Sequence, residues 1–128
     1  MEPVCKDFYN LAPQEQATQF RTYPIEKQLE IYRCEMRRKP PNLGRAYDIA
    51  SGGEKVIPVL VEQLRSEEDE HVDNDLIYIF RIMSRDGYLD HKQDVVEQIK
   101  EAVSRIKFYR TRQAAQESLD EIEKNVKD

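Results

Sequence analysis

The sequence has few residues that make tight turns, and it has no apolar run long enough to cross a membrane. Only four of its 128 residues are glycine and six are proline. No Asn-Gly or Asp-Gly pair lies between alternating apolar segments, so nothing indicates a β-hairpin and we expect no sheet. No stretch approaches the roughly 18 consecutive apolar residues of a membrane-spanning helix. We therefore expect no membrane span.

The short motifs of common catalytic and nucleotide-binding sites are also missing. The chain contains no GxSxG, P-loop or GxGxxG pattern. Its two histidines, His71 and His91, have no cysteine or second histidine at ligand spacing. The acidic residues from 67 to 75 do not fit a calcium-binding EF-hand loop, because both possible registers lack the required glycine. We expect no cofactor, no metal site and no enzymatic activity.

Cysteine occurs only twice, as Cys5 and Cys34, and no CxxC pair is present. The spacing gives no metal or disulfide framework, and we expect two independent thiols, with a disulfide as the alternative. The first residues lack the apolar core of a signal peptide. This favours a cytoplasmic location for the sequence as given. The alternative is a periplasmic protein or a lipoprotein whose signal was removed before Cys5.

The surface is highly charged and weakly acidic. Charged residues make up 35% of the chain and the net charge is −5. This balance argues against a nucleic-acid-binding protein, which usually has a basic domain. The length indicates one domain, residues 1–128. A small apolar core with a strongly hydrated surface is more typical of a stack of helices than of a sheet protein.

The segment 54–87 has the pattern of two helices joined by an acidic turn. In 54–65, Val56, Ile57, Leu60 and Leu64 fall on one helical face. The segment 72–85 contains the almost continuous apolar sequence LIYIFRIM, which is typical of a helix buried between neighbours.

One narrow polar stripe remains on this second helix. At 100° per residue, Asn74, Tyr78, Arg81 and Arg85 fall on the same side. An exposed tyrosine flanked by two arginines has the composition of an interface hot spot. Pairing of the arginines with Glu117, Asp120 or Glu121 of the last helix is the structural alternative.

The same apolar pattern returns about 40 residues later, which is a period typical of helical-repeat proteins. VIPVLVEQL at 56–64 resembles the first helix of a HEAT repeat, and TRQAAQESLDEI at 111–122 resembles its second helix. Asp73 stands where the family has an arginine, which departs from the usual pairing between repeats. The resemblance covers about residues 54–125, and it indicates very little about function.

The resemblance implies an all-α fold, a short right-handed stack of antiparallel helical hairpins with about six or seven helices. It also implies that the second helix of each repeat lines a concave face, which places Gln113 and Glu117 beside the stripe. We call Asn74, Tyr78, Arg81, Arg85, Gln113 and Glu117 the polar row.

The remaining segments are assigned in the same way. Residues 1–22 are expected to form an irregular arm, 1–10, and a short helix, 13–20, capped by Asn10. Residues 24–51 form an atypical first hairpin, with helices at 24–38 and 43–51 and with Leu43, Tyr47 and Ala50 facing inward. The repeats 54–87 and 92–125 follow. Terminal repeats of a solenoid are commonly atypical.

Two basic clusters lie at predicted turns. The first comprises Arg37, Arg38, Lys39 and Arg45, with Arg33 nearby. The second comprises Arg105, Lys107, Arg110 and Arg112. Either could contact phosphate or an acidic partner; the alternative is that the cations stabilise helix C-termini. The aromatic residues Phe108 and Tyr109 in the second cluster are expected in the core.

These observations lead to a non-catalytic protein-interaction or scaffold module, monomeric or weakly dimeric, that binds an acidic or peptide-like partner on the polar row. A small HEAT-like enzyme or ligand carrier is the first alternative, and it would need a pocket with a perturbed titratable group. A self-associating structural unit is the second. A DNA-binding role is a lesser variant.

Overall fold

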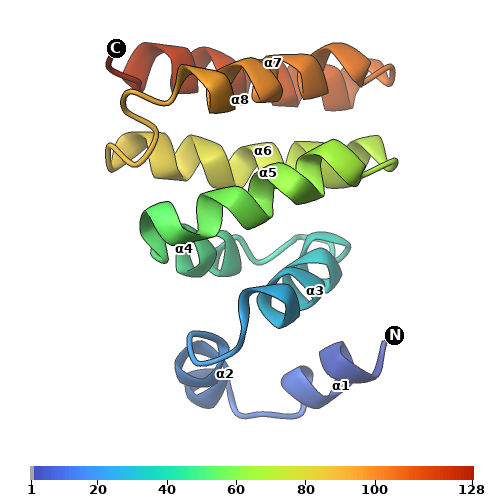
Figure 1. Cartoon of the computed structure of the whole chain (residues 1–128). Coiled ribbons are helices and arrows are strands. Elements are labelled where there is room, and N and C mark those ends of the chain that lie inside the picture. The colour runs from blue at the N-terminus through green and yellow to red at the C-terminus, as the bar shows by residue number, and fades with distance from the viewer. Residues whose placement is uncertain (1) are drawn as a thin grey trace. The chain divides into compact units, whose positions relative to one another are not determined.

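The computed structural model describes residues 2–128, which form eight α-helices and one short 3-10 helix without any strand (Figure 1). The predicted all-helical class is confirmed. None of the helices in this part of the chain has the length and apolarity needed to span a bilayer. The chain divides into two compact units, one up to Ile49 and one from Ala50 onward. The prediction of a single domain stays a prediction.

The first unit contains four helices, of which two begin at a proline. They are α1 (Pro3–Tyr9), α2 (Pro13–Phe20), α3 (Ile25–Met36) and α4 (Gly44–Ala50). Proline costs little in the first helical turn, where its missing N–H would have no intrahelical partner. The expected helices at 13–20, 24–38 and 43–51 are all present, with ends that shift by one or two residues.

The expectation of an irregular arm at residues 1–10 is wrong, because α1 occupies most of it and raises the helix count to eight. Cys5 and Phe8 lie one turn apart on its buried face, and α1 packs on α3. The ring of Phe8 meets the rings of Phe20 and Tyr23 edge-to-face, with centroids 6.0 and 6.5 Å apart. So short a helix is marginal alone, and tertiary packing stabilises it. Asn10 follows α1 and does not cap α2, whose N-cap residue is Ala12.

The inward face of α4 also differs from the expected one. Ala50 is buried as predicted, but Leu43 and Tyr47 are exposed, and Ala46 and Ile49 are buried with Ala50 instead. The predicted cap is present, because the Asn42 side chain accepts a hydrogen bond from the Gly44 N–H at 2.9 Å. The cap sets where the helix begins, and a helix of two turns gives too little periodicity to identify its buried face.

The second unit consists of two helical hairpins. Its elements are the 3-10 helix η1 (Gly53–Val56), α5 (Ile57–Ser66), α6 (Glu70–Arg85), α7 (Gln93–Arg105) and α8 (Tyr109–Asn125). The four predicted helices are therefore present. The helix α6 begins two residues earlier than expected, because Asp69 is its N-cap and accepts from the His71 N–H at 2.9 Å.

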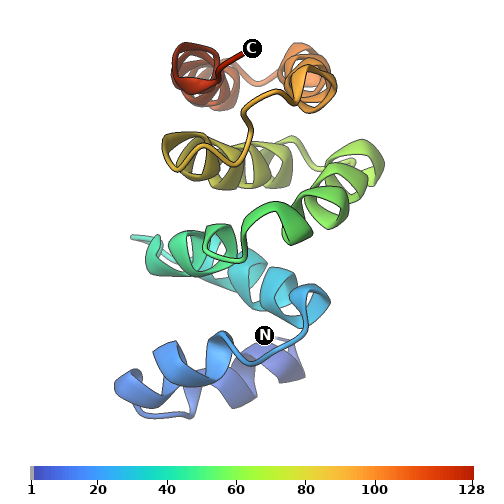
Figure 2. The same ribbon diagram turned by 60° about the vertical axis from the view of Figure 1, so that its left-hand side comes forward.

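The two hairpins lie on each other in the same direction. Helix α5 packs on α7, and α6 packs on α8; in Figure 2, α8 (red) lies over α6 (yellow) and α7 (orange) over α5 (green). Several side-chain contacts join α6 to α8, among them His71 to Thr111, Arg81 to Glu121, Arg85 to Glu121 and Ser84 to Asn125, at separations between 36 and 41 residues. Partners at similar separations require parallel helices.

The core of this unit centres on α6. Between Val72 and Ser84, nine of its residues are buried and only Asn74, Asp75, Tyr78 and Arg81 are not. This agrees with the prediction of a buried helix with one polar stripe. Residues from the other helices complete the core, among them Leu60, Leu64, Ile99, Ala102, Ala115 and Ile122.

Two glycines with positive φ flank the first hairpin of this unit, one before α5 and one after α6. Gly53 has φ 73°, and a Cβ there would lie 3.3 Å from the Tyr88 ring. Gly87, with φ 79°, follows Asp86, the C-cap residue of α6. Glycine adopts this left-handed conformation without the steric cost that other residues pay.

Candidate functional site

The polar row is spread over two neighbouring helices. Asn74, Tyr78 and Arg81 are partly exposed on α6, and Arg85 is exposed at its end. Gln113 and Glu117 are exposed on α8, the helix that packs on α6. The chain thus places the predicted residues on the solvent-facing parts of two adjacent parallel helices.

Within the row, Arg81 and Arg85 bind the same carboxylate of α8. The Arg81 Nε donates to Glu121 Oε1 at 2.7 Å, and the Arg85 Nε donates to Oε2 at 2.8 Å. These hydrogen bonds, those of Arg85 foremost, lower the pKa of Glu121 to about 2. Arg81 and Arg85 therefore pair with an acidic residue of the last helix, which was the alternative to a ligand-binding role. They join α6 to α8, and an acidic ligand would have to displace Glu121 to reach them.

A shallow hollow lies on the outer side of α8, and the sequence pattern pointed to only part of it. Two polar-row residues, Gln113 and Glu117, line it. Its full lining is Tyr109, Arg112, Gln113, Gln116, Glu117 and Asp120. Positively charged and neutral side chains lie toward the start of the helix, whereas Glu117 and Asp120 lie toward its middle. The hollow is therefore polarised along the helix axis.

The expectation that Phe108 and Tyr109 belong to the core is wrong. Phe108 is 56% exposed and Tyr109 is 74% exposed. They stand at the start of α8, between the buried residues Ile106 and Thr111. The sequence did contain one indication of this exposure. Phe108 and Tyr109 lie among Lys107, Arg110 and Arg112, and cations on both sides are typical of a solvated turn.

Contacts with the start of α6 hold this exposed turn in place. The Glu70 carboxylate accepts the backbone N–H of Lys107 at 3.1 Å and of Phe108 at 2.8 Å. These bonds, that of Phe108 first, lower the pKa of Glu70. His71 touches the Phe108 ring edge-on, with centroids 5.8 Å apart, and its Nδ1 lies 3.0 Å from the Thr111 hydroxyl oxygen. The exposed aromatics therefore sit on an ordered base.

Two carboxyl groups of α6 have raised pKa values. Burial raises the pKa of Asp73 to about 6, although Arg105 nearby opposes the shift. Burial also raises the pKa of Asp75 to about 7. Perturbed groups of this kind are what the enzyme alternative requires. Neither lines the hollow on α8, so the structure gives them no substrate-sized site there.

The basic cluster predicted in the first unit is divided among separate acids. Arg37 lies 3.9 Å from Glu2, and Arg38 lies 3.9 Å from Glu35. The Arg45 side chain is only 12% exposed and pairs with Asp48 at 3.3 Å. Lys39 is exposed. Arg45 therefore does not belong to a surface patch with the other three.

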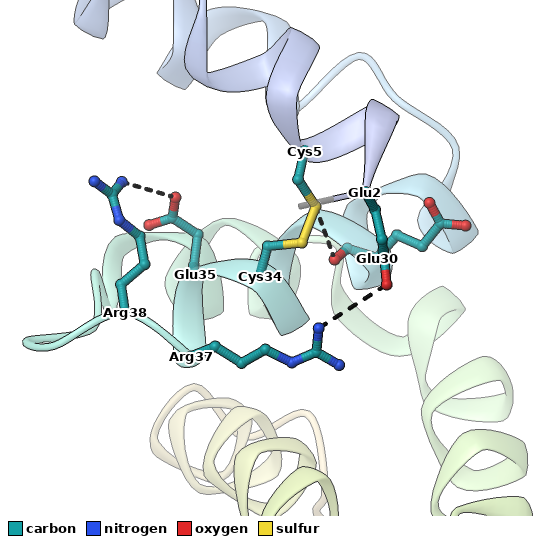
Figure 3. The surroundings of a disulfide bond; sticks show 7 residues. All are labelled: Glu2, Cys5, Glu30, Cys34, Glu35, Arg37 and Arg38. Atoms are coloured by element: carbon teal, nitrogen blue, oxygen red, sulfur yellow. Dashed lines mark hydrogen bonds and ion pairs between the residues drawn. A yellow bond between two sulfur atoms is a disulfide. The ribbon is translucent and has the colours of Figure 1, made fainter.

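The two cysteines form a disulfide, which corrects the expectation of two free thiols. The Cys5–Cys34 bond joins α1 to α3, and both residues are buried (Figure 3). The Cys5 sulfur lies 3.7 Å from the Glu30 carbonyl oxygen, and the pairs Glu2–Arg37 and Glu35–Arg38 flank the bond. The disulfide uses the sulfur atom that a lipid anchor at Cys5 would need.

Among residues 2–128, one group of three side chains lies close enough together to hold a metal ion. It consists of Glu2, Cys5 and Cys34. Both sulfur atoms are already bonded to each other, and a thiolate is the form of cysteine that binds metal. The group is therefore a disulfide with a neighbouring carboxylate.

The second unit thus carries a candidate surface made of the polar row, the hollow on α8 and the exposed turn at its start. Its exposed side chains include aromatic and arginine residues, which are types enriched where proteins bind each other. Comparisons of the chain with protein-family models, curated proteins and solved structures find no match.

Proposed function

We propose that the chain is a non-catalytic protein-interaction module that binds a short, peptide-like segment of another protein on the outer side of α6 and α8. The observation that carries the proposal is the fixed alignment of these two helices. Their side chains bond near the start of both helices, at His71 and Thr111, and again near their ends, where Arg81 and Ser84 bond to Glu121 and Asn125. An ordered surface binds a partner at a lower entropic cost than a mobile one.

The same alignment supports the proposed resemblance to HEAT repeats. Two hairpins that pack in the same direction, first helix on first and second on second, are the element from which such stacks are built. In such a stack the second helices form one extended surface. The polar row and the hollow on α8 would both belong to it.

The experiment is selection of binding peptides from a phage-displayed library of random short peptides on the immobilised chain. We expect a family of related sequences whose synthetic members bind in solution, measured by fluorescence anisotropy. A denatured sample of the chain is the control for non-specific capture. Failure to enrich any related sequences over this control would contradict the proposal.

A further inference from the structure

We infer that the turn at the start of α8 is the docking point of the module, and that its ligand is an acidic segment with an adjacent apolar side chain. We call Lys107, Phe108, Tyr109, Arg110 and Arg112 the aromatic–basic turn. The inference rests on the proposed function and specifies its site and the chemistry of the partner.

Exposure is the first argument. Phe108 and Tyr109 are consecutive and more than half exposed, whereas Phe8, Phe20 and Phe80, the other phenylalanines, are all buried. Exposed aromatic rings cost hydration free energy unless a partner covers them. The backbone beneath them is held by Glu70 at two N–H groups, so the rings stand on a structured turn.

Charge is the second argument. Lys107, Arg110 and Arg112 are exposed, and no ion pair involves them within the part of the chain that the structure describes. The whole chain carries a net charge of −5, whereas this turn gathers three cations beside one carboxylate, that of Glu70, which is held by the turn's own backbone N–H groups. Cations beside two aromatic rings match a segment in which carboxylates neighbour an apolar side chain.

The hollow on α8 indicates how the segment lies. It begins at Tyr109 and Arg112, continues past Gln113 and Gln116, and reaches Glu117 and Asp120. Glutamine side chains can donate to and accept from a peptide backbone. Acidic residues of the ligand therefore belong near the start of α8, and neutral or basic residues belong near Glu117. The same two carboxylates disfavour a nucleic-acid strand along the hollow.

The test uses peptides enriched in the display selection, labelled and titrated by fluorescence anisotropy. We expect them to contain Asp or Glu next to a large apolar residue. Tyr109→Ala, and separately the double change Arg110→Glu and Arg112→Glu, should weaken binding at least about tenfold. The side chains of Tyr109 and both arginines are exposed, so the variants should keep the helical circular dichroism of the wild type.

Two matched controls and one further variant separate the inference from the function. Lys124→Glu reverses a charge at the far end of α8, and Tyr47→Ala removes an exposed tyrosine from the first unit, outside the proposed binding surface. Each should change the affinity less than about twofold. Peptides that lose affinity with Tyr78→Ala, a change in the polar row, and keep it with Tyr109→Ala would overturn the inference while leaving the proposed function intact. Enrichment of no peptides at all would overturn both.

A further arm tests a different class of ligand with a labelled oligothymidylate. We expect no measurable binding at moderate salt. Binding that is tighter than that of the peptides, falls steeply with salt and is lost in Tyr109→Ala would identify a single-stranded nucleic-acid platform. That result would overturn the assignment of an acidic protein segment.

Discussion

Reduction of the Cys5–Cys34 disulfide should destabilise the first unit by a calculable amount. The bond closes a loop with a sequence separation of 29 residues. In the chain-entropy model, a closed loop of this length lowers the entropy of the unfolded chain enough to stabilise the fold by about 3.6 kcal/mol at 25 °C. The bond should matter more here than in a large domain, because it ties down a seven-residue helix that is not stable alone.

The assay is urea unfolding followed by circular dichroism, with oxidised protein compared with protein unfolded and refolded in a thiol reductant. Unfolding before reduction is needed because both cysteines are buried. The Cys5→Ser and Cys34→Ser double variant should match the reduced protein and should not respond to reductant. Since the loop lies wholly in the first unit, the loss should appear in the transition of that unit.

Two results would refute this reasoning. A difference in the free energy of unfolding below about 1 kcal/mol, far under the loop-closure value, would show that the bond does not constrain the unfolded chain as supposed. Two free thiols in the oxidised native protein, counted by alkylation and mass spectrometry, would show that the bond is not formed.

Three further predictions concern the second unit. Phe80→Ala, which removes a fully buried ring, should lower the free energy of unfolding by about 3–5 kcal/mol; a loss below about 1 kcal/mol in urea would mean that α6 is not in the core. Glu121 has its folded pKa lowered from 4.5 to about 2, so its stabilising effect is complete above 4.5 and is lost as the pH falls toward 2. Glu121→Gln should flatten this part of the pH–stability curve, and an unchanged acid limb would argue against the two arginine contacts. Asp75 has its folded pKa raised from 3.8 to about 7, so the folded chain binds the proton more tightly and stability falls as the pH rises across that interval. Asp75→Asn should reduce this fall and be more stable than the wild type above pH 7; the same slope in both proteins would contradict it.

Helix positions in the second unit could be predicted because their apolar periodicity is strong. The pattern in Ile57, Leu60 and Leu64 identified α5, and the near-continuous apolar run around Phe80 identified α6 as buried. Short helices gave weaker signals. The seven residues of α1 show only two buried positions, Cys5 and Phe8, which is too few to reveal a helical period.

The candidate site could be predicted only in part, because exposure at a turn depends on what packs beneath it. The stripe from Asn74 to Arg85 follows from helical geometry alone. The sequence could offer Glu121 only as one of three possible partners for Arg81 and Arg85. Phe108 and Tyr109 were expected in the core because aromatic residues usually bury their rings, yet the turn holds them outside.

By itself, the sequence determined the helical class, the positions of the long helices to within two or three residues, and the polar stripe on α6. These depend on interactions between residues three or four positions apart, which periodicity records directly. Tertiary structure alone decided three further features: the pairing of Cys5 with Cys34, the choice of Glu121 as the shared partner, and the Glu70 contact that holds the aromatic–basic turn. Each joins residues about 30 to 40 positions apart. Such distances are fixed by how helices pack, and no local pattern encodes them.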